Sequence, residues 1–182
     1  MTTKDTVFIA LFAALTAALA ILPPVNVPVI NVPITAQTFG VMLAGGVLGA
    51  RRGALSMILF LALVAVGLPF LSGGRGGAGV FMGPSGGFLF GWVLAAFAIG
   101  YMVEKSWQKL NFVSAITSCV VGGIIVLYAV GIPWIAVVAG ISIDKAALSA
   151  IAYIPGDLVK AGLAAIIMVQ VKRSYPLISV KA

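Results

Sequence analysis

Histidine is absent from this chain of 182 residues, Cys119 is its only cysteine, and it has just four acidic residues. A disulfide within the chain is therefore impossible, and the Cys and His clusters that hold zinc or haem cannot form. Charged residues make up only 8% of the sequence, whereas soluble domains contain about 25%. Hydrophobic residues make up 62% and the mean hydropathy is +1.22, so the sequence predicts a polytopic membrane protein.

The hydrophobic residues gather into six apolar segments, whose lengths approach the roughly 20 residues of a membrane-spanning helix. The sequence therefore predicts an all-α fold with six transmembrane helices in a single transmembrane domain over residues 1–182. Several segments are short, so we expect tilted helices or ends buried in protein. The expected spans are Val7–Leu22, Ala36–Ala50, Ala54–Phe70, Gly87–Val103, Phe112–Val130 and Leu148–Val171.

The net charge of +7 does not indicate nucleic-acid binding, because the basic residues are scattered between apolar spans and form no single polar face. With the N-terminus inside, Arg75 and Lys145 face outward and Lys160 lies within the last span. Basic residues prefer the cytoplasmic side, so both termini are predicted to be cytoplasmic. The eight bases on that side are Lys4, Arg51, Arg52, Lys105, Lys109, Lys172, Arg173 and Lys181.

A cleaved signal peptide is an alternative for the first segment, since Lys4 precedes an apolar run that contains "ALA" at 18–20. Asp5 argues against it, because an acid weakens the positive start of such a peptide. We therefore expect a membrane span here.

The last span carries an acid and a base in its first half, within "YIPGDLVKAGL". Residues three apart are helical neighbours, so Asp157 and Lys160 share a face. Helical rise puts Lys160 about 18 Å from Lys172 at the cytoplasmic end. Pro155 implies either a kink or the start of the regular helix. The pair either only neutralises two buried charges or forms a ligand site. A carboxylate accepts and an ammonium donates, which suits a urea, an amide or a lactam.

A glycine-rich loop, "LSGGRGGAGVFMGPSGG", separates the third and fourth spans and places eight Gly around Arg75. Backbone amides in such a loop can approach an anion closely, and the arginine adds charge. No Gly-Lys-Ser/Thr follows, so this is not a Walker phosphate loop. A flexible linker is the alternative, but Phe81, Met82 and Phe88 favour a loop that packs as a lid.

Polar side chains open the second span in "PITAQTFG". Thr35, Gln37 and Thr38 either line the cavity or, through Thr35, cap the helix. Trp134, in the expected fifth loop, is interpreted as an interface anchor. Both segments lie at the outer end of the expected topology.

The first span repeats a small residue every four positions, at Ala10, Ala14 and Ala18. Small residues at this spacing let another helix approach closely. The face either packs inside the protein or docks a separate membrane subunit. A partner is indicated because the sequence has no Walker motif, so the chain cannot hydrolyse ATP itself.

These features together resemble the BioY family, the substrate-binding S components of energy-coupling factor transporters for biotin. The resemblance covers essentially the whole chain and rests on three long runs: "NVPITAQTFGVMLAGGVLGARRG", "GGRGGAGVFMGPSGG" and "IPGDLVK". The Ala10, Ala14 and Ala18 face is similar to the family's contact with the transmembrane coupling subunit.

The resemblance implies biotin as the ligand. Its ureido ring would accept from Lys160 and donate to Asp157, with Tyr153 packed on the bicycle. The tail carboxylate would be held by loop amides or by Gln37, Arg75 or Ser85. The reverse orientation, with the carboxylate at Lys160, would leave Asp157 facing an anion.

The resemblance further implies a binding protein of a prokaryotic plasma membrane, without a cofactor or enzymatic activity of its own. It would capture biotin from outside and associate with a coupling subunit and two cytoplasmic ATPases, which use the ATP. A stand-alone biotin facilitator or proton-coupled carrier, in which Asp157 titrates, is the alternative. An intramembrane enzyme is a third hypothesis, and the sequence argues against it, because the chain has no His and no readable partner for Ser85, Ser114 or Ser149.

Overall fold

The protein is a bundle of helices with one short ribbon at its edge, shown by a computed structural model that describes residues 1–26 and 32–178. Over these residues the two strands, β1 (Val25–Asn26) and β2 (Pro33–Ile34), pair antiparallel. The α-helices are α1 (Thr3–Ala18), α2 (Gln37–Leu48), α3 (Ala50–Ala65), α4 (Gly86–Lys105), α5 (Phe112–Val120), α6 (Leu127–Ala139), α7 (Ile143–Ala150) and α8 (Ile154–Ser174).

Several helices join end to end into longer rods. A π-helical segment, Val121–Val126, connects α5 to α6, and a 3-10 turn, Ile151–Tyr153, connects α7 to α8. Each of the six predicted apolar segments is helical over most of its length. Within the described residues, four rods are long and apolar enough to cross a membrane: Thr3–Ile21, Gly86–Lys105, Phe112–Ala139 and Ile143–Ser174.

The boundary predicted for the fifth span was wrong. The helix continues past Val130 to Ala139, with Pro133 inside it. The last rod, predicted as the sixth span, begins at Ile143 instead of Leu148. The segment read as a long loop is therefore mostly helix, because its apolar residues extend α6 beyond the proline. Trp134, placed in that loop by the sequence, lies on α6.

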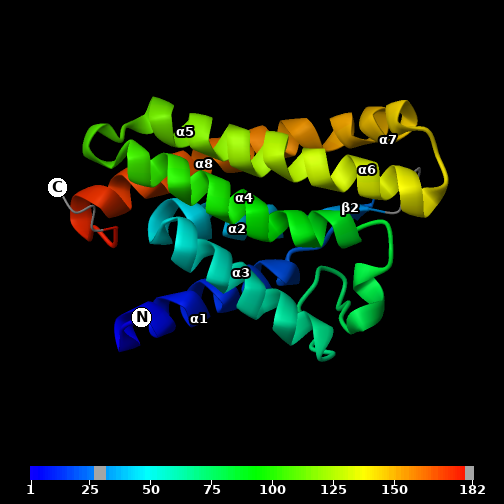
Figure 1. The fold of residues 1–182 in the computed structure, drawn as a ribbon, viewed down its shortest axis with the longest axis horizontal. Coiled ribbons are helices and arrows are strands. Elements are labelled where there is room, and N and C mark those ends of the chain that lie inside the picture. The colour runs from blue at the N-terminus through cyan, green and yellow to red at the C-terminus, as the bar shows by residue number, and fades with distance from the viewer. Residues whose placement is uncertain (27–31, 179–182) are drawn as a thin grey trace.

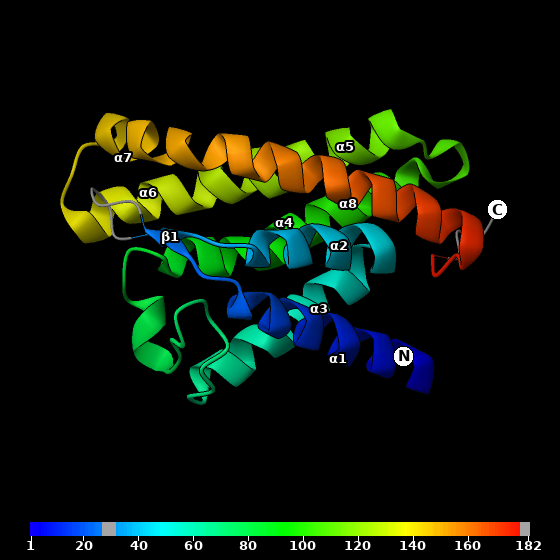
Figure 2. The same ribbon diagram turned by 180° about the vertical axis from the view of Figure 1, so that it is seen from behind.

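The short helix α2 lies at the centre of the bundle and contacts α1, α3, α4 and α8 (Figures 1 and 2). Ten of its twelve residues are buried. Its glycines permit this closeness: a Cβ on Gly45 would collide with the Ala96 carbonyl oxygen of α4, and one on Gly46 would collide with Met168 of α8. A central helix enclosed by protein can be shorter than the bilayer is thick.

The basic residues and the ribbon lie at opposite ends of the bundle. The first turn of α1, the α2–α3 turn, the α4–α5 connection and the last turn of α8 share one end (Figure 1). The ribbon, the loop 66–85 and the α6–α7 turn share the other. Of the eight bases predicted to be cytoplasmic, Lys181 lies outside the described residues, and the other seven belong to the first end.

The small-residue face of α1 points away from the bundle. Ala10, Ala14 and Ala18 are all exposed, whereas Ala13 and Thr16 are buried against the neighbouring helices. The interpretation of this face as an internal packing surface was therefore wrong. Its role in docking stays a prediction.

Candidate functional site

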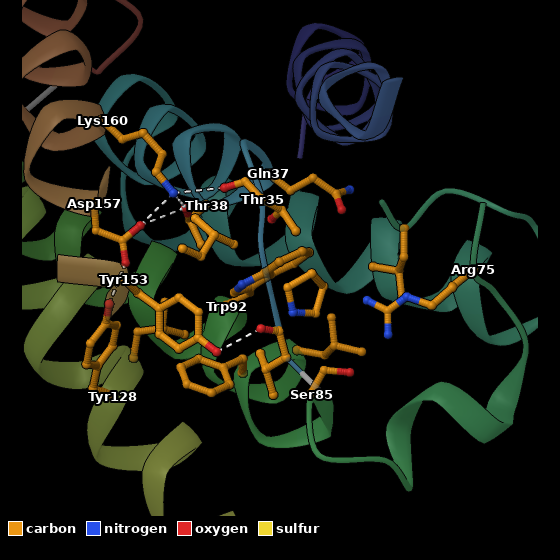
Figure 3. A pocket seen from close by; sticks show the side chains of 17 residues that line it. Thr35, Gln37, Thr38, Arg75, Ser85, Trp92, Tyr128, Tyr153, Asp157 and Lys160 are labelled. Atoms are coloured by element: carbon orange, nitrogen blue, oxygen red, sulfur yellow. Dashed lines mark hydrogen bonds and ion pairs between the residues drawn. The ribbon is translucent and has the colours of Figure 1, made fainter. Parts of the chain in front are cut away.

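A pocket at the ribbon end of the bundle is lined by residues of β2, α2, the loop 66–85, α4, α6 and α8 (Figure 3). Its two ends differ in chemistry. An ion pair lies on one side, and an arginine and a serine lie on the other. All six residues predicted to bind ligand line this one pocket: Gln37, Arg75, Ser85, Tyr153, Asp157 and Lys160. Their proximity is thus observed, and their contact with a ligand stays a prediction.

The acidic end is built around Asp157, which is 4% exposed. Its Oδ1 lies 2.6 Å from the Lys160 Nζ and accepts from the Thr38 hydroxyl at 3.2 Å. Its Oδ2 accepts from the Tyr128 hydroxyl at 2.7 Å. A carboxylate has roughly four lone-pair sites, and these bonds from described residues use three. One site on Oδ2 remains for a donor in the pocket.

The ammonium of Lys160 is fully used. Beside Asp157, its Nζ donates to the Thr35 carbonyl oxygen at 2.8 Å and to the Thr38 hydroxyl at 2.6 Å. An ammonium has three protons, and here each has an acceptor. Lys160 must therefore release one of these partners before it can donate to a ligand.

The start of α8 and the start of α2 explain how the pair is held. The regular part of α8 begins at Ile154, with Pro155 in its first turn, where the missing amide proton costs nothing. On α2 the N-cap is Ala36, and no side chain of the described residues caps that end. The capping role considered for Thr35 was therefore wrong, and its carbonyl serves Lys160 instead.

Gln37 is tied to the protein by all its polar atoms. Its Nε2 donates to the carbonyl oxygens of Thr16 and Phe70 at 3.0 and 2.9 Å. Its Oε1 accepts from the backbone amide and the hydroxyl of Ser72. At 1% exposure it joins α1, α2 and the loop 66–85. It thus forms a fixed wall of the pocket.

The basic end belongs to the loop 66–85, which has a defined conformation. Leu71 and Arg75 exchange two backbone hydrogen bonds, and the Arg75 Nε donates to the Ser72 carbonyl oxygen at 3.3 Å. Partial burial lowers the pKa of the Arg75 guanidinium from its ordinary value, although a guanidinium keeps its proton in proteins. The Trp134 Nε1 donates to the Gly83 carbonyl oxygen at 2.9 Å and fastens the loop to α6.

Sequence reasoning missed two pocket residues, Tyr128 and Trp92. Tyr128 orients Asp157, and Trp92 is an indole in the pocket wall. A sequence signal existed for Trp92, because tryptophan in membrane proteins gathers at the interfaces, whereas this one lies inside an apolar span, six residues after the start of α4. Tyr153, which was predicted, donates its hydroxyl to the Val32 carbonyl oxygen at 2.8 Å and meets Phe88 edge-on.

Comparison with known proteins shows to which family the chain belongs. The model of the BioY family matches residues 1–177. The chain belongs to the BioY family. It is 49% identical to the biotin transporter BioY of Rhizobium etli, over 100% of both chains. It is 42% identical to the probable biotin transporter BioY of Bacillus subtilis, over 95% of this chain and 92% of that one.

A solved structure has the same fold as this BioY-family chain. The crystal structure of the S-component for biotin from an ECF-type ABC transporter matches it with a TM-score of 0.91. The two sequences are 34% identical, and the match covers 97% of each chain. The all-helical S-component fold, with its several apolar helices, places the chain in the cell membrane as a multi-pass protein.

Proposed function

We propose that this chain is the biotin-binding S component of an ATP-driven energy-coupling factor uptake transporter. One observation carries the proposal. A single pocket holds a buried carboxylate with a free acceptor site at one end and an arginine at the other. Biotin has the matching polarity, with urea N–H donors on its bicycle and a carboxylate on its tail. The names of the related transporters and of the matching S-component support this choice of ligand.

The ureido ring belongs at Asp157 and Lys160 in this proposal. A ring N–H donates to the free site on the Asp157 Oδ2, and Lys160 exchanges one present acceptor for the urea oxygen. Tyr153 packs on the bicycle from the pocket wall. The reverse orientation is disfavoured, because it would bring the ligand carboxylate to a buried Asp157, and like charges repel at short range.

The tail carboxylate belongs at the opposite end of the pocket. Arg75 offers a guanidinium that can bind a carboxylate through two parallel N–H groups. Ser85, which is 9% exposed at the start of α4, adds a hydroxyl, and Gln37 shapes the wall between the two ends. A helix N-terminus also favours an anion.

The membrane topology is part of the proposal: six spans, with both termini in the cytoplasm. The gathering of the basic residues at one end of the bundle supports it. Single cysteines can test it in a Cys119→Ser background. A membrane-impermeant maleimide added to intact cells should label Ala78→Cys and spare Gln108→Cys. Labelling of Gln108→Cys without lysis would contradict this orientation.

The chain further associates with a transmembrane coupling subunit and two cytoplasmic ATPases, which supply the energy. The exposed face of Ala10, Ala14 and Ala18 supports this, since it offers a close-packing surface that the described residues leave uncovered. No cofactor is needed by the S component.

Titration calorimetry of the detergent-purified chain with biotin tests the proposed function. One biotin should bind per chain. A pantothenate titration is the matched control, since that vitamin has a carboxylate but no cyclic urea, and it should give no heat of binding. Absence of biotin binding by the folded protein would refute the proposal.

A further inference from the structure

The indole of Trp92 presents a buried hydrogen-bond donor to the pocket. The residue lies on α4, is 4% exposed and lines the cavity between its two ends (Figure 3). Among the residues that the structure describes, its Nε1 has no hydrogen-bond partner. Buried polar groups in native proteins are nearly always bonded, so each exception needs an explanation.

The surroundings hold this donor in place. The ring of Phe60, itself fully buried, lies 5.8 Å from the Trp92 ring centroid and tilts against it. In Figure 3 the indole nitrogen is turned toward the side of the pocket where Thr38 and Tyr153 lie, away from Arg75. Trp134 provides a contrast, because its Nε1 already donates to a carbonyl oxygen. The N–H donor without a partner therefore belongs to the tryptophan that lines the pocket.

The hydrogen-bond pattern at the acidic end indicates which ligand atom this donor meets. Asp157 can accept from a urea N–H without any rearrangement, whereas all three protons of Lys160 are engaged. A urea oxygen has two lone pairs, so it can accept from Lys160 and from a second donor. Among the described residues, the Trp92 N–H is the buried donor that can bond to this oxygen without first breaking an existing hydrogen bond.

We propose that the Trp92 indole N–H donates a hydrogen bond to the ureido oxygen of bound biotin. This inference rests on the proposed function. It makes Trp92 a specificity residue, because a buried donor without an acceptor penalises ligands that lack a carbonyl at that point. The thioether sulfur of biotin is a weak acceptor and cannot replace the ureido carbonyl as the partner of the indole N–H.

A cycle of two proteins and two ligands tests the bond. Wild type and Trp92→Phe are titrated with biotin and with 2-thiobiotin, whose C=S group is a weaker acceptor. The lost indole volume affects both ligands alike, so it cancels in the cycle. The factor by which Trp92→Phe weakens biotin should exceed the factor for 2-thiobiotin by about tenfold. Equal factors would mean that Trp92 only packs, and would overturn the inference.

Phe88→Leu is the matched control, since Phe88 lines the same pocket without a polar atom. It should weaken both ligands by the same factor. If wild type binds no biotin, the proposed function and this inference fall together. If wild type binds and the cycle shows no coupling, only this inference falls.

Nuclear magnetic resonance of the wild-type protein keeps the test independent of the variant's folding. The chain has three tryptophans, so three indole N–H resonances are expected, and the spin-coupled neighbours of Trp92 in the wild-type protein assign the relevant one. Saturating biotin should move the Trp92 N–H resonance downfield, and 2-thiobiotin should move it less. An unchanged Trp92 resonance at saturation would overturn the inference.

Discussion

At the scale of single residues, the buried ion pair determines what the pocket can bind. Asp157 and Lys160 hold each other, and a pair that only neutralised its own charges would leave no site open. Asp157 lines the pocket, and the described residues instead leave one of its acceptor sites unused. Two charged groups buried in a membrane protein are expensive to keep, and a ligand that completes their bonding gives them a function.

Removing either partner of the pair should weaken biotin binding. We expect Asp157→Leu and Lys160→Met each to cost at least about 2 kcal/mol by calorimetry, because the remaining charge is left buried and unpaired. The double variant should lose much less than the sum of the two. Lys145→Met, an exposed base on α7, is the control and should bind like wild type. Wild-type affinity in Asp157→Leu would disprove the ureido assignment.

Tyr128 should matter through Asp157. Its hydroxyl bond of 2.7 Å to the Oδ2 fixes the direction of the remaining lone pair. Tyr128→Phe should weaken biotin by about 1.5–3 kcal/mol, the usual worth of a hydrogen bond to a charged group. Tyr101→Phe, which changes an exposed tyrosine, should have no effect on the same titration. An unchanged affinity in Tyr128→Phe would mean that Asp157 needs no such support.

At the scale of elements, the outer face of α1 separates binding from uptake. Ala14→Trp should leave biotin affinity intact, because Ala14 is exposed, but should abolish biotin uptake by cells that contain the complete transporter. Ala13→Trp on the opposite, buried face should instead lower the thermal stability of the purified chain. Normal uptake by Ala14→Trp would exclude this face as the docking surface.

The loop 66–85 owes its conformation to glycines. Gly77 has a φ of +87° and a ψ of 162°, a region that other residues rarely adopt. Gly77→Ala should therefore destabilise the loop by about 1–3 kcal/mol and weaken biotin, because Arg75 lies two residues away. Gly79→Ala is the matched control, since both sites have open space but Gly79 has an ordinary φ. Both variants are compared by calorimetry, and equal affinities would show that the loop conformation is unimportant for binding.

At the scale of the whole molecule, the chain should bind biotin without accumulating it. Proteoliposomes that hold this chain alone should bind biotin and show no uptake under a pH gradient. Adding the coupling subunit and the ATPases with ATP should start uptake. Accumulation driven by a pH gradient in the chain alone, lost in Asp157→Asn with binding retained, would favour the proton-coupled carrier.

Much of this architecture follows from the sequence, because apolar length and the placement of bases are strong signals. The closeness of Asp157 and Lys160 followed from helical spacing alone. The end of α6 could not be predicted, since Pro133 looks like a helix breaker in the sequence, yet the helix runs past this exposed proline to Ala139. The role of Tyr128 depends on its hydrogen bond to Asp157, which lies on a distant segment of the chain, and no local pattern encodes such a contact.

The brevity of α2 has a consequence for how the protein responds to its vitamin. Twelve residues extend about 18 Å, whereas the hydrocarbon layer is about 30 Å thick. The pocket lies at the N-terminal end of α2, where a longer helix would have added turns. In the proposed binding mode, biotin fills this place and packs against the interior of the bundle where further turns of α2 are absent. The vitamin should then act as a removable part of the core, and the melting temperature of the chain should climb as biotin is added.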